Sequence, residues 1–279
     1  MRIDLHTHSV ASDGTEQPDE VIASAVRAGL DVVALTDHDS TRGWDEAERA
    51  ARELGIGLVR GVELSCRLHG RSVHLLGYLL DPQSPALLAE AETVREARVE
   101  RARRIVDRLS KDLPLTWGDV LQQTGDEATV GRPHIADALV ARGHVPDRTA
   151  AFDRLLATGS PYWVPHYAPD AAHAIGMVLE AGGVPVLAHP GAARRDRPVS
   201  DAEIAGLVDA GLAGLEVDHR DNDEAQRARL RAAARRHDLL ETGSSDYHGT
   251  GKPNRLGENL TTAEVLAEIT QRGRLEVLR

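Results

Sequence analysis

The chain has 279 residues, of which 41% are hydrophobic and 28% charged, so it can bury a substantial core. Its formal net charge is −11 and it lacks a long basic tract, which argues against binding long duplex nucleic acid. Bound divalent cations would still let an acidic protein handle a phosphorylated substrate. Cys66 is the only cysteine, so intrachain disulfides and a cysteine-based zinc site are excluded.

The N-terminus predicts a strand at residues 2–5 and lacks the basic and apolar regions of a signal peptide. No apolar run approaches the roughly 20 residues that a membrane helix needs. We therefore expect a cytoplasmic protein without a membrane partner.

Short apolar runs alternate with amphipathic stretches, a pattern typical of parallel α/β folds. Strands are predicted at residues 2–5, 31–35, 57–62, 73–79, 184–188, 214–217 and 239–241. Helices are predicted between them at residues 18–29, 41–54, 201–210, 223–237 and 262–271.

Residues 84–169 break this alternation. They begin with a long charged helical pattern at 86–109, and shorter helical patterns follow at 116–123, 133–141 and 148–157. We predict a helical insertion at 84–169 in a barrel formed by residues 1–83 and 170–279.

Histidines and carboxylates concentrate where the predicted strands end. His74, near the start of the fourth strand, is the exception. In parallel α/β folds the carboxyl ends of the strands meet at one edge, so these side chains can share a cavity. Nitrogen and oxygen donors without thiolate suit Zn, Mn, Fe or Mg. The residues concerned are His6, His8, Asp13, Asp37, His38, Glu63, His74, His189, Asp246 and His248.

Two pairs have the spacing of residues on one face of a strand. His6 and His8 are two positions apart, so both imidazoles can reach the same ion, and Asp246 and His248 repeat the spacing. A single histidine is more often a structural residue. Two pairs together with the other strand-end groups favour a metal site.

These groups lie in short motifs that resemble the PHP (polymerase and histidinol phosphatase) superfamily. The motifs are His6-Thr-His8-Ser9, Asp13-Gly14, Thr36-Asp37-His38-Asp39, Gly61-Val62-Glu63, His189-Pro190-Gly191 and Ser245-Asp246-Tyr247-His248. The insertion and the segment Gly131-Arg132-Pro133-His134 resemble the nucleotide phosphoesterase branch, which includes bisphosphate nucleotide phosphatases and 5′→3′ exoribonucleases. This resemblance implies a distorted (β/α)7 barrel with a helical insertion and three divalent metal ions.

The resemblance also implies how the ligands are shared. One ion would be held by His6, His8, Glu63 and Asp246, a second by Glu63, His74 and His189, and a third by Asp13, His38 and His248. Many superfamily members have histidine where Asp13 stands, and the aspartate fits the nucleotide branch and favours Mn or Mg. Manganese is our first expectation, with Zn, Fe and Mg as alternatives.

The implied chemistry is hydrolysis by a metal-activated hydroxide held among Glu63, His6, His8, Asp246 and His189. We find no serine or cysteine with the context of a nucleophile. Asp37 and Asp39 flank His38, and they could orient its imidazole or cap the following helix.

Substrate-binding candidates come from the insertion. Arg98, Arg101, Arg104 and Arg108 are spaced to share a helix face, which is also the pattern of a solvated, salt-bridged surface. In the resembled branch this helix and the Gly-Arg-Pro-His segment cover the metals. The candidates for a second phosphate or the nucleoside are therefore Arg101, Arg104, Arg132 and His134, although packing at a helix start would also explain the last two.

Weaker candidates lie late in the chain. Lys252 and Asn254 closely follow the last ligand pair and could reach the substrate, and His219 ends a strand and could face the cavity.

The expected reaction is hydrolysis of a phosphomonoester on a small nucleotide, above all the 3′-phosphate of a 3′,5′-bisphosphate. Alternatives are a 5′→3′ exonuclease acting on short oligonucleotides, a histidinol-phosphate-type phosphatase and a metal-binding module without activity. The complete set of ligand positions argues against the last. The oligomeric state is not predicted.

Overall fold

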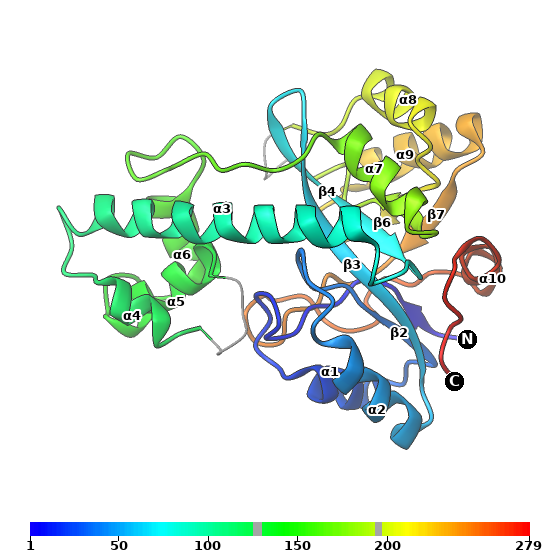
Figure 1. The fold of residues 1–279 in the computed structure, drawn as a ribbon, viewed down its shortest axis with the longest axis horizontal. Helices are drawn as coiled ribbons and strands as arrows, with labels where there is room; N and C mark the ends of the chain where they lie inside the picture. The colour runs from blue at the N-terminus through cyan, green and yellow to red at the C-terminus, as the bar shows by residue number, and fades with distance from the viewer. Residues whose placement is uncertain (125–129, 193–196) are drawn as a thin grey trace.

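The computed structural model describes residues 1–124, 130–192 and 197–279. Within these residues seven strands form one sheet, in which each strand neighbours the next along the chain (Figure 1). The strands are β1 (Ile3–Asp4), β2 (Val32–Leu35), β3 (Gly57–Leu68), β4 (Arg71–Tyr78), β5 (Val184–Leu187), β6 (Gly214–Asp218) and β7 (Leu240–Gly243). The predicted distorted barrel is confirmed.

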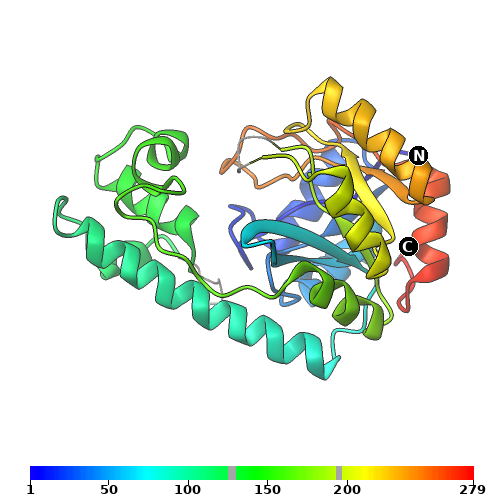
Figure 2. The same ribbon diagram turned by 90° about the horizontal axis from the view of Figure 1, so that it is seen from above.

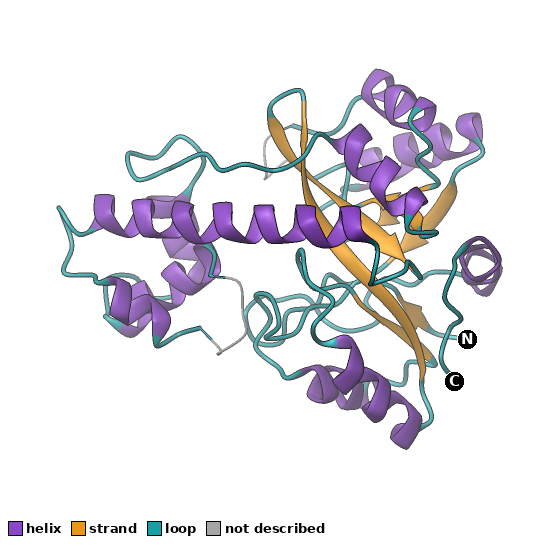
Figure 3. Cartoon of the chain, viewed as in Figure 1, coloured by secondary structure: helices purple, strands orange, loops and turns teal. Residues whose placement is uncertain are grey.

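Helices cover the outside of the sheet and form a separate group at one side (Figure 3). They are α1 (Pro18–Arg27), α2 (Trp44–Leu54), α3 (Pro85–Leu109), α4 (Trp117–Leu121), α5 (Arg132–Ala141), α6 (Arg148–Ala151), α7 (Ala171–Glu180), α8 (Asp201–Asp209), α9 (Glu224–His237) and α10 (Ala263–Arg272). A short π-helix, η1 (Phe152–Leu156), follows α6, so the helix predicted at 148–157 changes its hydrogen bonding part-way. Among the described helices, none combines the length and the apolar character required to cross a bilayer.

One strand departs from the predicted parallel arrangement. β4 runs antiparallel to both of its neighbours, β3 and β5, whereas the other pairs are parallel. β3 continues to Leu68, beyond its predicted end at residue 62, and His69 and Gly70 turn the chain back with φ angles of 48° and 84°. The parallel pairing that the alternating pattern indicated therefore does not extend to β4.

The sheet buries apolar residues on both faces. Val32, Leu76 and Val186 belong to an inner cluster that packs against Leu266 and Ile269 of α10. Their chain neighbours, such as Val33 and Leu187, belong to the outer cluster beneath α1, α2, α7, α8 and α9. Successive strand residues point to opposite faces, and so each strand contributes to both clusters.

The barrel is nearly closed. In the described residues no ladder pairs β1 with β7, but isolated bridges connect Ile3 with Thr261 and Thr7, after β1, with Tyr247, after β7. The loops after β1 and β7 therefore approach each other at the end of the barrel where the predicted ligands lie.

Helix α3 connects two hydrophobic cores. Leu87, in its first turn, packs with the barrel, whereas Ala102, Ile105 and Leu109 pack in a separate cluster with α4, α5 and α6. Seen from above, the small helices lie at the far end of α3 from the sheet (Figure 2). Arginines midway along α3 consequently lie between the barrel and the helical group.

Candidate metal centre and anion site

Glu63 is at the centre of the predicted ligand set. Its side chain lies in β3 and is only 1% exposed. The Oε2 atom is 3.1 Å from Nε2 of His6, 3.1 Å from Nε2 of His8 and 3.2 Å from Nδ1 of His38. One carboxylate oxygen thus faces three imidazoles that are delivered by the loops after β1 and β2.

The other oxygen of Glu63 faces two further imidazoles. Oε1 is 2.7 Å from Nδ1 of His74 and 3.1 Å from Nε2 of His189. His74 lies early in β4, but β4 is antiparallel and His74 pairs in register with Ser65, two residues beyond Glu63. The reversed strand direction therefore brings a residue from the start of a strand to the edge where the other strands end.

Asp246 also approaches His6 and His8. Its Oδ1 atom is 3.4 Å from Nε2 of His6 and 3.3 Å from Nε2 of His8. Its Oδ2 atom accepts a hydrogen bond from Nζ of Lys252 at 2.9 Å, and Nε2 of His219 lies 3.7 Å away. Asp246 has a φ of 55°, a backbone conformation that non-glycine residues rarely adopt and that often marks functional positions.

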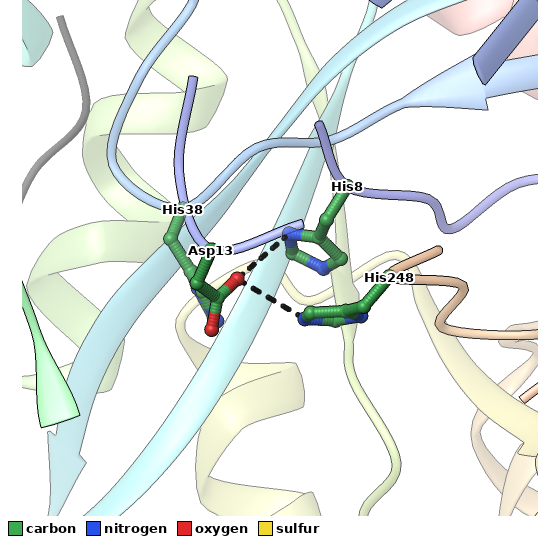
Figure 4. Close-up of side chains that lie close together, drawn as sticks. All are labelled: His8, Asp13, His38 and His248. Atoms are coloured by element: carbon green, nitrogen blue, oxygen red, sulfur yellow. Dashed lines mark ion pairs between the residues drawn. The ribbon is translucent and has the colours of Figure 1, made fainter. Parts of the chain in front are cut away.

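A second group of predicted ligands surrounds Asp13 (Figure 4). Oδ1 of Asp13 is 3.1 Å from Nε2 of His248 and 3.8 Å from Nδ1 of His8. Among the described residues, Asp13 Oδ1, His38 Nδ1 and His248 Nε2 are buried without a partner in hydrogen-bonding geometry. Buried polar atoms need such a partner or a cation, so this group fits a metal ion.

All nine predicted ligands therefore lie together in one group, which is called the pocket from here on. Donor atoms lie within 4.8 Å of one another in three sets, which are His6, His8, Glu63 and Asp246; His8, Asp13, His38 and His248; and His38, Glu63 and His74. The predicted grouping placed His8 and His38 in one set each, whereas in the structure each belongs to two sets. His189 reaches the pocket through Glu63.

The electrostatics of the pocket also favour cations. Burial lowers the pKa of His8, but the carboxylates of Asp246 and Glu63 outweigh this effect and raise it to about 9. Burial likewise acts against ionisation of Glu63, yet the surrounding histidines, His38 foremost, hold its pKa well below the usual range. The buried carboxylates thus remain charged and draw positive charge into the pocket, which divalent ions would supply.

A group of basic side chains lies beside the metal ligands. We call Arg67, Arg98, Arg101 and Arg132 the arginine cluster, because the charges of all four act on His166. Arg67 donates to the carbonyl oxygen of His166 at 2.9 Å. Burial lowers the pKa of His166 to about 2, and Arg101, Arg98, Arg67 and Arg132 add to the shift. Burial and the neighbouring guanidinium groups lower the pKa of Arg101 to about 9. Guanidinium groups whose charges act on one another in this way would suit an anion.

Arg98 connects the arginine cluster to the metal ligands. Its Nε atom is 3.0 Å from Oδ2 of Asp39, the residue after His38, and its guanidinium donates to Oγ of Ser65. Ser65 is the register partner of His74. The cluster therefore borders the pocket that contains Glu63.

The substrate-binding candidates are placed differently from one another. Arg101 donates from Nε to the carbonyl oxygen of Val164 at 2.8 Å, and Arg132 donates to that of Leu156 at 3.0 Å, so both are held within the cluster. The Arg104 side chain is 52% exposed and approaches Glu100 at 4.0 Å. Each helical residue adds about 100°, so Arg104, six residues after Arg98, points about 120° away from it around the helix. Arg104 therefore faces a different side of α3 from Arg98.

His134 begins α5 and is buried. Its Nδ1 atom accepts the backbone N–H of Gly131 at 3.0 Å, which caps the helix. Burial lowers the pKa of His134, and the charge of Asp13 opposes this shift. The structure thus gives His134 the packing role weighed from the sequence, within the electrostatic influence of the predicted ligand Asp13.

Known proteins resemble this chain over nearly its whole length. The PHP domain model matches residues 4–111. The chain is 35% identical to 3′,5′-nucleoside bisphosphate phosphatase from Chromobacterium violaceum over 91% of this chain and 89% of the relative. It is 33% identical to a 5′-3′ exoribonuclease from Haemophilus influenzae over 97% and 98% of the two chains.

The chain belongs to the PHP family. A solved structure from Bifidobacterium adolescentis, described as a metal-dependent phosphoesterase, shares 46% identity with this PHP protein. It superposes with a TM-score of 0.95 over 97% of this chain and 96% of the other. The expected class is confirmed: the protein is a metal-dependent PHP phosphoesterase.

Two buried residues of this PHP protein were missed or undervalued from the sequence. Glu216 in β6 contacts His6 and the backbone of His189, and His219, treated as a weaker candidate, lies against Asp246. The signal for Glu216 was a single acidic residue inside the apolar run of 214–217.

Asp37 and Asp39 have neither of the roles weighed for them. Asp37 accepts hydrogen bonds from the backbone and hydroxyl of Ser9 and from the hydroxyl of Ser12. Asp39 is bonded to Ser65 and Arg98. They hold loops of the pocket in place, and the N-cap of α2 is Gly43.

Proposed function

We propose that this PHP phosphoesterase removes the 3′-phosphate from 3′,5′-bisphosphate nucleotides. The observation that carries the proposal is the arginine cluster beside the converged ligand set, because the two together would suit a substrate with two separate anionic groups. A relative that matches nine-tenths of the chain is named for this activity.

The proposed metal centre holds three divalent ions, with manganese as the expected metal. Its ligands are His6, His8, Glu63 and Asp246 for the first ion, Glu63, His74 and His189 for the second, and Asp13, His38 and His248 for the third. Such ions lower the pKa of water and neutralise charge on a phosphoryl group. Glu63 can serve two ions because its oxygens face different imidazoles.

The remaining phosphate would bind at the arginine cluster. Arg101 and Arg132 are the principal contacts, since guanidinium groups pair with phosphate oxygens in a planar, two-pronged geometry. His134 is a further candidate, because the charge of Asp13 acts on its imidazole. Arg104 is exposed, so we assign it at most a peripheral contribution.

Exonuclease activity on short RNA is the second candidate. The Haemophilus influenzae relative that is named for it matches 97% of this chain. A phosphatase releases inorganic phosphate and leaves the nucleoside 5′-phosphate, whereas an exonuclease releases mononucleotides from an oligomer.

The test uses purified, manganese-loaded protein with three substrates. These are adenosine 3′,5′-bisphosphate, a 5′-phosphorylated RNA trinucleotide and histidinol phosphate, and products are separated by ion-exchange chromatography. We expect the highest kcat/KM for the bisphosphate, with adenosine 5′-phosphate and inorganic phosphate as products. Faster release of mononucleotides from the trinucleotide would replace the proposal with the exonuclease, and faster cleavage of histidinol phosphate would remove any role for the second anion.

A further inference from the structure

Glu216 connects two ligand positions that come from different strands. Its carboxylate is fully buried in β6. Oε1 accepts a hydrogen bond from Nδ1 of His6 at 2.9 Å, and Oε2 accepts one from the backbone N–H of His189 at 2.7 Å. The hydroxyl of Ser244 also donates to Oε1. We infer that Glu216 is a positioning residue that fixes His6 and His189 for metal binding, an inference that rests on the metal centre proposed above.

The contact with His6 determines which ring nitrogen can bind a cation. Nδ1 must carry a proton to donate to the Glu216 carboxylate, and Nε2 is then the nitrogen available to a metal. Nε2 is the atom that faces Glu63 at 3.1 Å and Asp246 at 3.4 Å. A carboxylate behind an imidazole also makes the opposite nitrogen a stronger donor to a metal.

The contact with His189 restrains a strained backbone. His189 has a φ of 33°, which lies outside the backbone conformations that non-glycine residues favour. Its N–H is bound by Glu216, and two residues later the N–H of Gly191 donates to Oδ1 of Asn222 at 2.9 Å. Asn222 in turn donates to the carbonyl oxygen of Glu216 at 3.0 Å. The end of β6 thus holds the His189 loop at two points.

Both contacts require acceptors, which explains why a carboxylate is needed here. Glutamine has the same shape but only one acceptor oxygen. In Glu216→Gln the amide can accept from His6 or from His189, and its NH2 group then faces the other donor. A merely space-filling residue would tolerate the change, whereas a positioning residue would not.

Thr242→Val provides a matched control. Thr242 is the register partner of Glu216 on β7, it is 1% exposed, and its hydroxyl has no hydrogen-bond partner among the described residues. The substitution therefore alters the same buried layer of the sheet and removes no hydrogen bond that the described residues make.

The test measures metal binding without substrate. Apo-proteins are titrated with Mn²⁺ in equilibrium dialysis, and the visible spectrum of the Co²⁺ form reports ligand geometry. We expect E216Q to bind Mn²⁺ about 10- to 100-fold more weakly than wild type and to show a changed Co²⁺ spectrum. T242V should remain within about 2-fold of wild type. At saturating Mn²⁺, E216Q should recover much of its kcat with little change in KM.

The outcomes separate this inference from the proposed function. Wild-type protein that fails to bind Mn²⁺ would refute the metal centre itself. E216Q with the affinity and Co²⁺ spectrum of T242V would refute the role of Glu216 alone. If E216Q does not fold by circular dichroism, Asn222→Ala is titrated instead, because it loosens the His189 loop and leaves the contact between His6 and Glu216. It should weaken Mn²⁺ binding in the same direction, and unchanged binding would overturn the inference.

Discussion

Burial separates the arginines of α3 that face the pocket from those that face water. Arg101 is largely buried within the arginine cluster, whereas the side chain of Arg104 is 52% exposed. The two are three residues apart on one helix, so their substitution is a matched comparison.

Arg101→Gln is expected to raise KM for adenosine 3′,5′-bisphosphate about 10- to 100-fold, because a charge-assisted hydrogen bond contributes roughly 1.5–3 kcal/mol. Arg104→Gln should change KM by less than about 2-fold, as is usual for exposed sites. Steady-state kinetics with manganese-loaded protein provide the measurement. Equal effects of the two substitutions would rule out an anion site at the cluster.

The proposed metal centre predicts that metal content and turnover are lost together. His8 faces both Glu63 and Asp246, and so His8→Ala should lose bound Mn²⁺ and reduce kcat/KM by about 10³-fold or more. Metal content is measured after dialysis by inductively coupled plasma mass spectrometry. His173→Ala, on an exposed part of α7, is the control and should retain both properties. Persistent turnover in His8→Ala would show that the site is misassigned.

Single residues were predicted from the sequence where local geometry determines their direction. The spacing of His6 and His8 is sufficient to place both on one side of the chain, and Glu63 directly follows the apolar run of residues 57–62. The arginine cluster was only partly anticipated. Arg67 and His166 reach it from β3 and from the chain after η1, and no local pattern connects positions that far apart.

At the scale of elements, strand positions could be predicted but strand direction could not. Apolar runs marked all seven strands, yet periodicity is the same for parallel and antiparallel strands. The β3–β4 hairpin depends on His69 and Gly70, whose positive φ angles permit a tight reversal. The π-helix after α6 was equally hidden, since the pattern at 148–157 only indicates a helix.

The capping box of α8 predicts a pH-dependent contribution to stability. Hydrogen bonds from Arg197, then from Ser200, and the charge of Arg71 lower the pKa of Glu203 to about 2 from its ordinary value of 4.5. A lowered pKa in the folded state stabilises the protein above pH 4.5, and this contribution is lost as the pH falls towards 2.

Glu203→Gln should therefore lower the free energy of unfolding by about 1 kcal/mol at pH 7 and flatten its dependence on pH between 4.5 and 2. Urea unfolding at several pH values measures both. Glu268→Gln, which removes an exposed pair with Arg272, is the control and should have little effect. An unchanged pH profile in Glu203→Gln would contradict this account of α8.

At the scale of the whole molecule, the predicted ligands connect the regions that follow the first and last strands of the barrel. His6 and His8 follow β1, whereas Asp246 and His248 follow β7, and isolated bridges connect these regions in the described residues. Cations bound between them would hold the barrel closed in the folded state and would have no comparable site in the unfolded chain.

Removing metal should therefore lower thermal stability. Manganese at 100 times its Kd would add roughly 2.7 kcal/mol, which corresponds to a rise in Tm of about 5–10 °C for a protein of this size. Differential scanning fluorimetry in EDTA and in Mn²⁺ measures the difference. Asp246→Asn should show a much smaller rise. Equal Tm values for the wild type in both buffers would mean that ions do not connect the regions after β1 and β7.

Helix α3 has a consequence for how substrate range could change. It runs from Pro85 to Leu109 without glycine, and its only proline is at the first turn, so bending it would break backbone hydrogen bonds. Arg98 and Arg101 lie midway along this stiff rod, between its anchorages at Leu87 and Ile105. The distance between the scissile phosphate and a second negative group of the substrate would thus be set by a rigid helix rather than by a flexible loop. A preference for a longer or shorter substrate would require α3 to pack differently on the barrel. A longer loop alone would leave this distance unchanged.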